Sequence, residues 1–120
     1  MKKTTLVLGA SVNTSRYSNM AIRKLIEKKS KVFAIGSRKG CVLGVQIEVG
    51  KLLFEDVDTV TLYLKPVRQK EYYQYILSLK PKRVIFNPGT ENREFEIVLE
   101  ENNIEVVLAC TLVLLSLNRY

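Results

Sequence analysis

A glycine, two serines and an arginine lie at the first polar turn of the chain, where they could bind a phosphate group. Residues 4–10 form a short apolar run that contains Gly9, and Ser11, Arg16 and Ser18 follow it. From Ser18 onward, apolar side chains recur at helical spacing. A glycine between a strand and a helix lets the backbone approach a ligand, and the free amides at the helix start suit a phosphate. The sequence therefore predicts an anion-binding turn at this point.

This turn departs from the glycine pattern of dinucleotide-binding proteins. Ser11 and Thr14 stand where the fingerprint G-x-G-x-x-G has its second and third glycines. The polar loop 11–17 is also longer than the two to six residues that are usual between a strand and a helix. Both features disfavour an NAD site.

A second candidate loop follows the apolar run 31–35 and carries two cations, Arg38 and Lys39. NAD sites usually have an acidic residue here, which holds the ribose hydroxyl. An acid would repel a phosphorylated ribose, whereas arginine and lysine pair with it. The loop therefore predicts a nucleotide with an extra phosphate on its ribose, and both coenzyme A (CoA) and NADP fit that description.

Apolar runs and amphipathic segments alternate along the chain and would position these loops. Strands are expected at 4–10, 31–35, 59–64, 82–87 and 104–109. Helices are expected from residue 18 and at 68–79, 91–102 and 111–117, with a short helical turn at 51–56. This alternation predicts a single Rossmann-like α/β domain over residues 1–120, with a five-stranded parallel sheet in the order 3-2-1-4-5 and helices on both faces.

Four polar loops would meet at the carboxyl edge of that sheet, where ligands bind in open α/β folds. Their sequences are GASVNTSRYSN, GSRKG, KPVR and NPGTEN. Glycine and proline also occur in ordinary turns, so no single loop identifies a site. Their convergence on one edge predicts a crevice between the first and fourth strands.

The amino-acid composition indicates which kinds of binding partner and which cellular compartment to expect. The net charge is +7, and residues 1–39 carry ten Lys and Arg against one acid, which indicates either an anionic partner or a solvated basic surface. The two cysteines and the absence of histidine predict neither a disulfide framework nor a metal site. The apolar runs are too short for a signal peptide or a membrane span, so we expect a cytoplasmic protein without a membrane partner.

Three motifs resemble those of a known family. GAS followed six residues later by SN-x-A spans 9–21, NPGTEN spans 87–92 and ACTL spans 109–112. In order and spacing they resemble the small stand-alone CoA-binding domain proteins, which are related to the CoA-binding domain of succinyl-CoA synthetase α-subunits. The resemblance covers nearly the whole chain and implies a Rossmann-like fold that binds CoA or acyl-CoA.

The resemblance also implies roles for particular residues. Gly9, Ala10 and Ser11 would line the pyrophosphate turn, and Arg16, Ser18 and Asn19 would meet phosphate at the helix start. Gly36, Ser37, Arg38 and Lys39 would hold the adenosine and its 3′-phosphate. Leu64, Lys65 and Pro66 would flank the adenine or the pantetheine arm, and Asn87, Pro88 and Gly89 would border the far side of the crevice.

No set of residues predicts catalysis. The synthetase relatives use a phosphorylated histidine, which this chain lacks. Cys110 is the one plausible nucleophile near the crevice, and no histidine can activate it. Glu91 and Glu94 are better placed to favour the start of the third helix through its dipole. We therefore expect a binding or sensor module without catalytic residues, whose protein partner the sequence does not identify.

The sequence leaves open two functions other than CoA binding. An NADP-binding redox-sensing protein would also need cations after the second strand, but the long first loop and its missing glycines disfavour it. A nucleic-acid-binding domain would use the basic N-terminal half, but no recognised module or aromatic stacking platform accompanies those charges. Steep salt dependence of binding would indicate nucleic acid.

Overall fold

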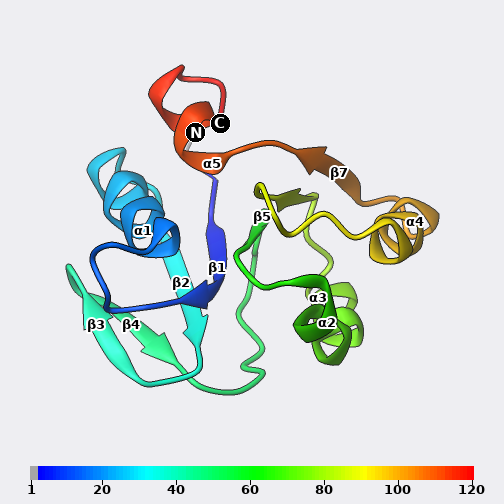
Figure 1. Ribbon diagram of the computed structural model, residues 1–120, viewed down its shortest axis with the longest axis horizontal. Coiled ribbons are helices and arrows are strands. Elements are labelled where there is room, and N and C mark those ends of the chain that lie inside the picture. Colours follow the sequence, from blue (N-terminus) through cyan, green and yellow to red (C-terminus); the bar gives the residue numbers. More distant parts are fainter. Residues whose placement is uncertain (1–2) are drawn as a thin grey trace.

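A mostly parallel sheet of seven strands forms the centre of this computed structural model, which describes residues 3–120 (Figure 1). The strands are β1 Thr5–Ala10, β2 Val32–Gly36, β3 Gly40–Val42, β4 Val45–Glu48, β5 Thr59–Leu62, β6 Arg83–Phe86 and β7 Glu105–Leu108. Their order is β3-β4-β2-β1-β5-β6-β7. All neighbouring pairs are parallel except β3 and β4, which form an antiparallel hairpin.

The prediction of five strands in the order 3-2-1-4-5 is wrong in both number and order. A hairpin of β3 and β4 follows β2, and β4 pairs with the edge of β2 that the third predicted strand was expected to occupy. That third strand is β5, and it pairs with the other side of β1. The strand order therefore reverses between β1 and β5, and not between the first and fourth predicted strands.

The turn of the hairpin explains why its strands are difficult to recognise in the sequence. Leu43 and Gly44 both have positive φ angles, 47° and 85°, as a two-residue type I′ turn requires. Asn-Gly or Asp-Gly is the usual signal for such a turn, and leucine is not. The preceding strand has only three residues and an exposed middle position, Cys41, so it lacks a clear apolar pattern.

Helices cover both faces of the sheet (Figure 1). They are α1 Tyr17–Glu27, α2 Pro66–Gln69, a 3-10 turn η1 Lys70–Tyr72, α3 Tyr73–Leu79, α4 Arg93–Glu101 and α5 Thr111–Ser116. Because side chains alternate along β1, Leu6 and Leu8 pack with the α3 and α4 side, whereas Val7 packs with Ile22 of α1 and Leu115 of α5. Within residues 3–120, no helix is both long and apolar enough to cross a membrane.

Most predicted boundaries lie within two residues of those observed, with two exceptions. The helix predicted at 68–79 is divided into α2, η1 and α3. The helical turn predicted at 51–56 is wrong, because this segment is irregular. Its place is fixed instead by side chains, since Phe54 stacks on Phe33 with ring centroids 4.2 Å apart.

Gly36 allows the ends of β1 and β2 to approach closely. A Cβ atom at this position would lie 2.3 Å from the carbonyl oxygen of Ala10, which is backbone and cannot rotate away. We expect Gly36→Ala to lower the free energy of unfolding by about 1–3 kcal/mol through overpacking. Urea denaturation would measure the loss, with Ser37→Ala, whose side chain is exposed, as the control. Unchanged stability of Gly36→Ala would show that the two strand ends can separate freely.

Candidate functional site

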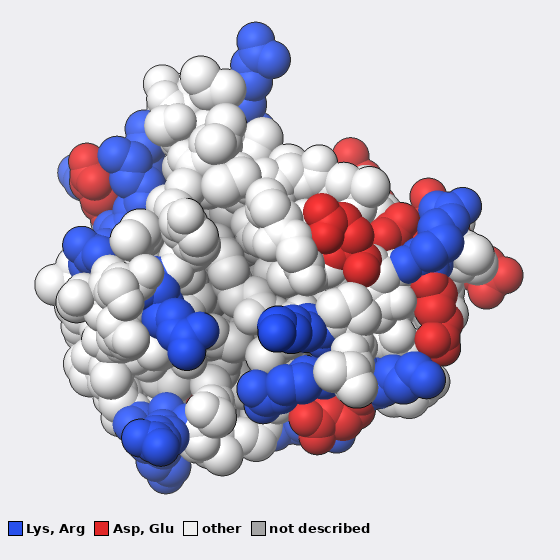
Figure 2. All heavy atoms as spheres, viewed as in Figure 1, with Lys and Arg blue, Asp and Glu red and all other residues white. Residues whose placement is uncertain are grey.

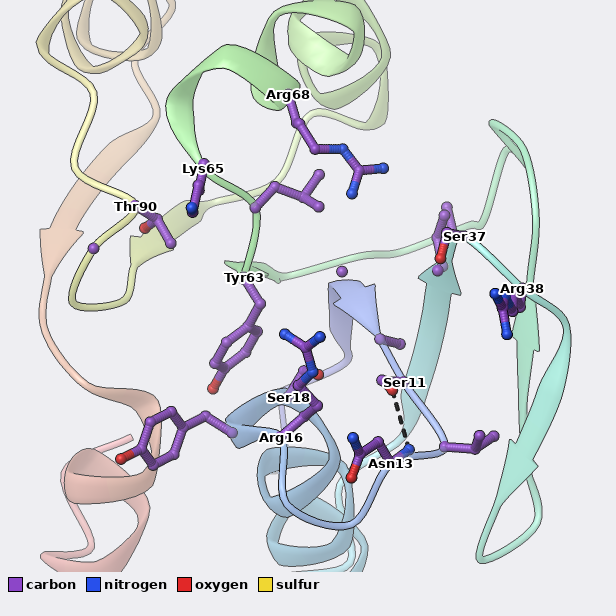
Figure 3. A pocket seen from close by; sticks show the side chains of 18 of the residues that line it. Ser11, Asn13, Arg16, Ser18, Ser37, Arg38, Tyr63, Lys65, Arg68 and Thr90 are labelled. Atoms are coloured by element: carbon purple, nitrogen blue, oxygen red, sulfur yellow. Dashed lines mark hydrogen bonds between the residues drawn. The ribbon is translucent and has the colours of Figure 1, made fainter.

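A cleft of about 730 Å³ opens at the carboxyl ends of β1, β2, β5 and β6 (Figure 3). It is lined by the loops that follow these strands. Residues 9–13 and 16–18 contribute from the end of β1 and the turn after it, and residues 36–39 contribute from the end of β2 and the loop after it. The opposite wall is formed by residues 63–65, Arg68 and residues 88–90.

Among residues 3–120, five cationic side chains line the cleft, and no acidic side chain does. They are Arg16, Arg38, Lys39, Lys65 and Arg68. Within residues 3–120, none of the five forms an ion pair. Figure 2 shows Lys and Arg atoms around the central hollow, whereas most acidic atoms lie towards α4. Low-dielectric walls lined by one sign of charge concentrate the field, so the cleft attracts anions.

The start of α1 faces this cleft without a cap of its own. Arg16 is the N-cap residue, its side chain forms no capping hydrogen bond, and the first turn of the helix contains no acid. The loop before it is shaped internally, because the Ser11 hydroxyl accepts a hydrogen bond from the Asn13 amide at 3.0 Å (Figure 3). The first amides of the helix and its positive dipole end therefore remain free for an anion.

The opposite wall is held together by the buried side chain of Gln69. Its amide group donates to the carbonyl oxygens of Leu64 and Thr90, both at 2.8 Å. Asn92 donates in turn to the Gln69 side-chain oxygen at 3.0 Å. This network fixes the loop that carries Lys65 against the turn that carries Thr90, so the wall is preformed.

The structure brings most of the predicted site residues together and excludes three. Those that line the cleft are Gly9, Ala10, Ser11, Arg16, Ser18, Gly36, Ser37, Arg38, Lys39, Leu64, Lys65, Pro88 and Gly89. Asn19, Pro66 and Asn87 do not line it. Lining residues that the sequence did not single out as site residues are Val12, Asn13, Tyr17, Ile35, Tyr63, Arg68, Tyr72 and Thr90.

The two excluded asparagines are buried and bind the backbone. Asn19 donates to the carbonyl oxygen of Ser11 at 2.9 Å and accepts from Arg23, so it shapes the first loop. Asn87 donates to the Thr61 hydroxyl at 2.7 Å and accepts from the Thr111 amide at 2.9 Å. These contacts position the loops around the cleft.

Comparison with known proteins places the chain in a family. The family model described as CoA binding domain matches residues 3–116. The chain belongs to this CoA-binding domain family. No curated protein matches the sequence significantly.

Solved structures share this fold over most or all of the chain. The crystal structure of an uncharacterized protein is 51% identical, with a TM-score of 0.97, and the match covers 100% of this chain and 99% of that one. A Thermus thermophilus protein is 28% identical with a TM-score of 0.86, over 99% of this chain and 91% of that one. A dinucleotide-forming acetyl-coenzyme A synthetase of Ca. Korarchaeum cryptofilum, solved with phosphate and ADP, shares the fold at 16% identity and a TM-score of 0.74. The match covers 89% of this chain and 25% of that one.

Tyr63 is a feature of this CoA-binding domain that no sequence motif indicates. It lies directly after β5 and lines the cleft (Figure 3). Its hydroxyl is buried and has no hydrogen bond of standard geometry among residues 3–120, although the hydroxyls of Thr111 and Thr61 lie near it. Burial raises the pKa of Tyr63 from 10.0 to about 12, and these two hydroxyls lower it by less, so the hydroxyl keeps its proton at neutral pH.

The reactive groups considered in the sequence lie outside the lining of the cleft. Cys110 is half-buried at the start of α5, and neither it nor Cys41 lines the cleft. Glu94 lies in the first turn of α4, where a carboxylate suits the helix dipole. Glu91 accepts a hydrogen bond from the Gly89 amide at 2.8 Å and thereby shapes the NPG turn. The two glutamates therefore have structural roles, and neither cysteine is part of the cleft lining.

Proposed function

We propose that this domain binds coenzyme A or an acyl-CoA in the cleft and acts as a binding or sensor module. The observation that carries the proposal is the group of five unpaired cations in a cleft without acids. CoA carries roughly four negative charges, because a phosphomonoester contributes about −1.5 to −2 and the diphosphate adds two more. The family match supports the same ligand.

The two kinds of phosphate in CoA fit two parts of the cleft. The uncapped start of α1, with Arg16 and Ser18, suits the diphosphate, because backbone amides and the helix dipole act together there. The loop after β2, with Ser37, Arg38 and Lys39, suits the 3′-phosphate of the ribose. Both groups belong to one continuous cleft, so a single ligand can reach them.

The residues that line the cleft support binding without chemical turnover. They include no cysteine and no carboxylate, so the described cleft offers neither a thiol nucleophile nor an acidic general base. The hydroxyl groups of Ser11, Ser18 and Ser37 have no histidine available in the chain to activate them. The proposal therefore assigns recognition to the cleft and leaves any reaction to another protein.

Thermal unfolding with added nucleotides tests the ligand directly. A ligand that binds only the folded state adds RT ln(1 + [L]/Kd), which is about 2.7 kcal/mol at a hundredfold excess over Kd. We expect CoA to raise the melting temperature more than NADP at equal concentration, and NAD to have little effect. A larger shift with NADP than with CoA would instead support the redox-sensing alternative.

A further inference from the structure

Arg68 extends into the cleft from the wall opposite the start of α1 (Figure 3). It belongs to α2, and its side chain is exposed, so a ligand in the cleft can reach it. The next residue, Gln69, is fully buried, and its hydrogen bonds to the carbonyl oxygens of Leu64 and Thr90 hold α2 against the turn after β6. An accessible cation is therefore presented to the cleft from a fixed backbone.

Arg68 does not pair with the carboxylate that the neighbouring helical turn offers. Glu71 follows it by three residues, a spacing at which side chains on consecutive helical turns are neighbours. Lys24 and Glu27 form an ion pair of 3.5 Å at this spacing in α1. Among residues 3–120, Arg68 forms no ion pair, and its guanidinium lies in the cleft. Its charge is therefore left for an anion that enters the cleft.

The distribution of cations in the cleft indicates which anion this is. In the proposed binding mode, Arg38 and Lys39 meet the 3′-phosphate, whose charge is about −1.5 to −2. The diphosphate carries two further negative charges, and on the wall formed by the turn after β1, Arg16 is the one lining cation within residues 3–120. Figure 3 shows Arg68 opposite Arg16, whereas Lys65 lies on the side away from Arg38. Arg68 is thus placed to supply the second positive charge to the diphosphate.

Resting on the proposed function, we propose that Arg68 binds the diphosphate of CoA from the wall opposite Arg16, so that the ligand bridges α1 and α2. A guanidinium offers two parallel N–H donors, which match the oxygens of a phosphate. The two walls lie on either side of the point where the strand order reverses, since α1 follows β1 and α2 follows β5. The bridge would favour a diphosphate over a single phosphate, because a second phosphate can approach Arg68 while the first stays at the start of α1.

Arg68→Ala removes the guanidinium without removing a buried contact. The ligand-free variant should melt within about 3 °C of wild type, because the side chain is exposed. Calorimetric titration should show CoA and dephospho-CoA weakened equally, about tenfold to a hundredfold, because both carry the diphosphate. Adenosine 3′,5′-bisphosphate, which has a single phosphate at its 5′ position, should bind within about twofold of its wild-type affinity. Arg68→Lys should recover part of the loss, since it restores the charge but not the paired donors.

Phosphorus NMR of bound CoA identifies the group that Arg68 contacts, because the diphosphate and the 3′-phosphate give separate signals. Arg68→Ala should move the diphosphate signals of the bound ligand and leave the 3′-phosphate signal in place. Movement of the 3′-phosphate signal alone, with dephospho-CoA binding unaffected, would assign Arg68 to the ribose phosphate and overturn the proposal. Weaker binding with unmoved diphosphate signals would mean a contact with the adenine or the pantetheine arm, which also overturns it.

Lys70→Ala is the matched control, because it removes a charge two residues away, outside the cleft lining. Lys70 pairs with Glu94 at 3.9 Å on the exposed surface, so its loss should change stability little and weaken all three ligands by less than about twofold. If Arg68→Ala loses no more affinity than Lys70→Ala, Arg68 acts only through the general field, and the bridge is rejected. Wild-type protein that binds none of the three ligands would instead contradict the proposed function itself.

Discussion

Replacing both Arg38 and Lys39 with alanine is expected to weaken CoA binding about tenfold to a hundredfold and to leave dephospho-CoA binding nearly unchanged. Both side chains line the cleft after β2 and lack an acidic partner within residues 3–120. A hydrogen bond to a charged group contributes about 1.5–3 kcal/mol, so loss of this pair from the 3′-phosphate should reduce affinity by at least tenfold. Calorimetric titration of the two ligands against wild type and double variant measures the difference.

A control variant is needed because any loss of positive charge from a basic protein weakens its general electrostatic attraction for anionic ligands. Lys28→Ala/Lys29→Ala removes the same charge from the end of α1, outside the cleft. It should weaken both ligands slightly and equally, and less as the salt concentration rises. Equal losses of CoA and dephospho-CoA in the Arg38→Ala/Lys39→Ala variant would reject this loop as the 3′-phosphate site.

The class of fold could be predicted from the sequence, but the sheet order could not. Alternating apolar and amphipathic segments follow from local periodicity, and the helix end at Asn102 with a left-handed Asn103 (φ 60°) follows from local chemistry. The strand order depends on which strand pairs with the edge of β2 that faces away from β1. The β3–β4 hairpin, whose Leu43-Gly44 turn lacks the usual residues, occupies that edge, so β5 pairs with β1.

The part of the candidate site that could be predicted from the sequence is the part whose position depends only on where a strand ends. Residues that directly follow β1 and β2 line the cleft because every parallel strand ends at the same edge. Tyr63 also lines the cleft but lies outside the four predicted loops, because its place in the lining depends on β5 lying beside β1. Asn87 is buried and does not line the cleft, since a polar residue after a strand can face either a ligand or the backbone and this one binds the backbone.

Asn87 is expected to control stability and not ligand contact. It donates to the carbonyl oxygen of Leu62 at 2.9 Å and accepts from the amide of Thr111 at 2.9 Å, so it connects the end of β5 with the start of α5. Asn87→Ala leaves both buried backbone groups without partners. Each such loss costs about 1–3 kcal/mol, so we expect the two losses together to lower the free energy of unfolding by about 2–6 kcal/mol.

Urea denaturation of Asn87→Ala, followed by titration of the folded variant with CoA, separates the two roles. Asn102→Ala is the control, because this exposed side chain donates to the Val98 carbonyl at 2.8 Å and its loss should cost less than about 1 kcal/mol. The midpoint for Asn87→Ala should fall with an unchanged slope, since the folded surface stays the same. The folded fraction should bind CoA within about threefold of wild type, because residue 87 does not line the cleft. A variant with wild-type stability and a tenfold loss of affinity would show instead that the Asn87 side chain contacts the ligand.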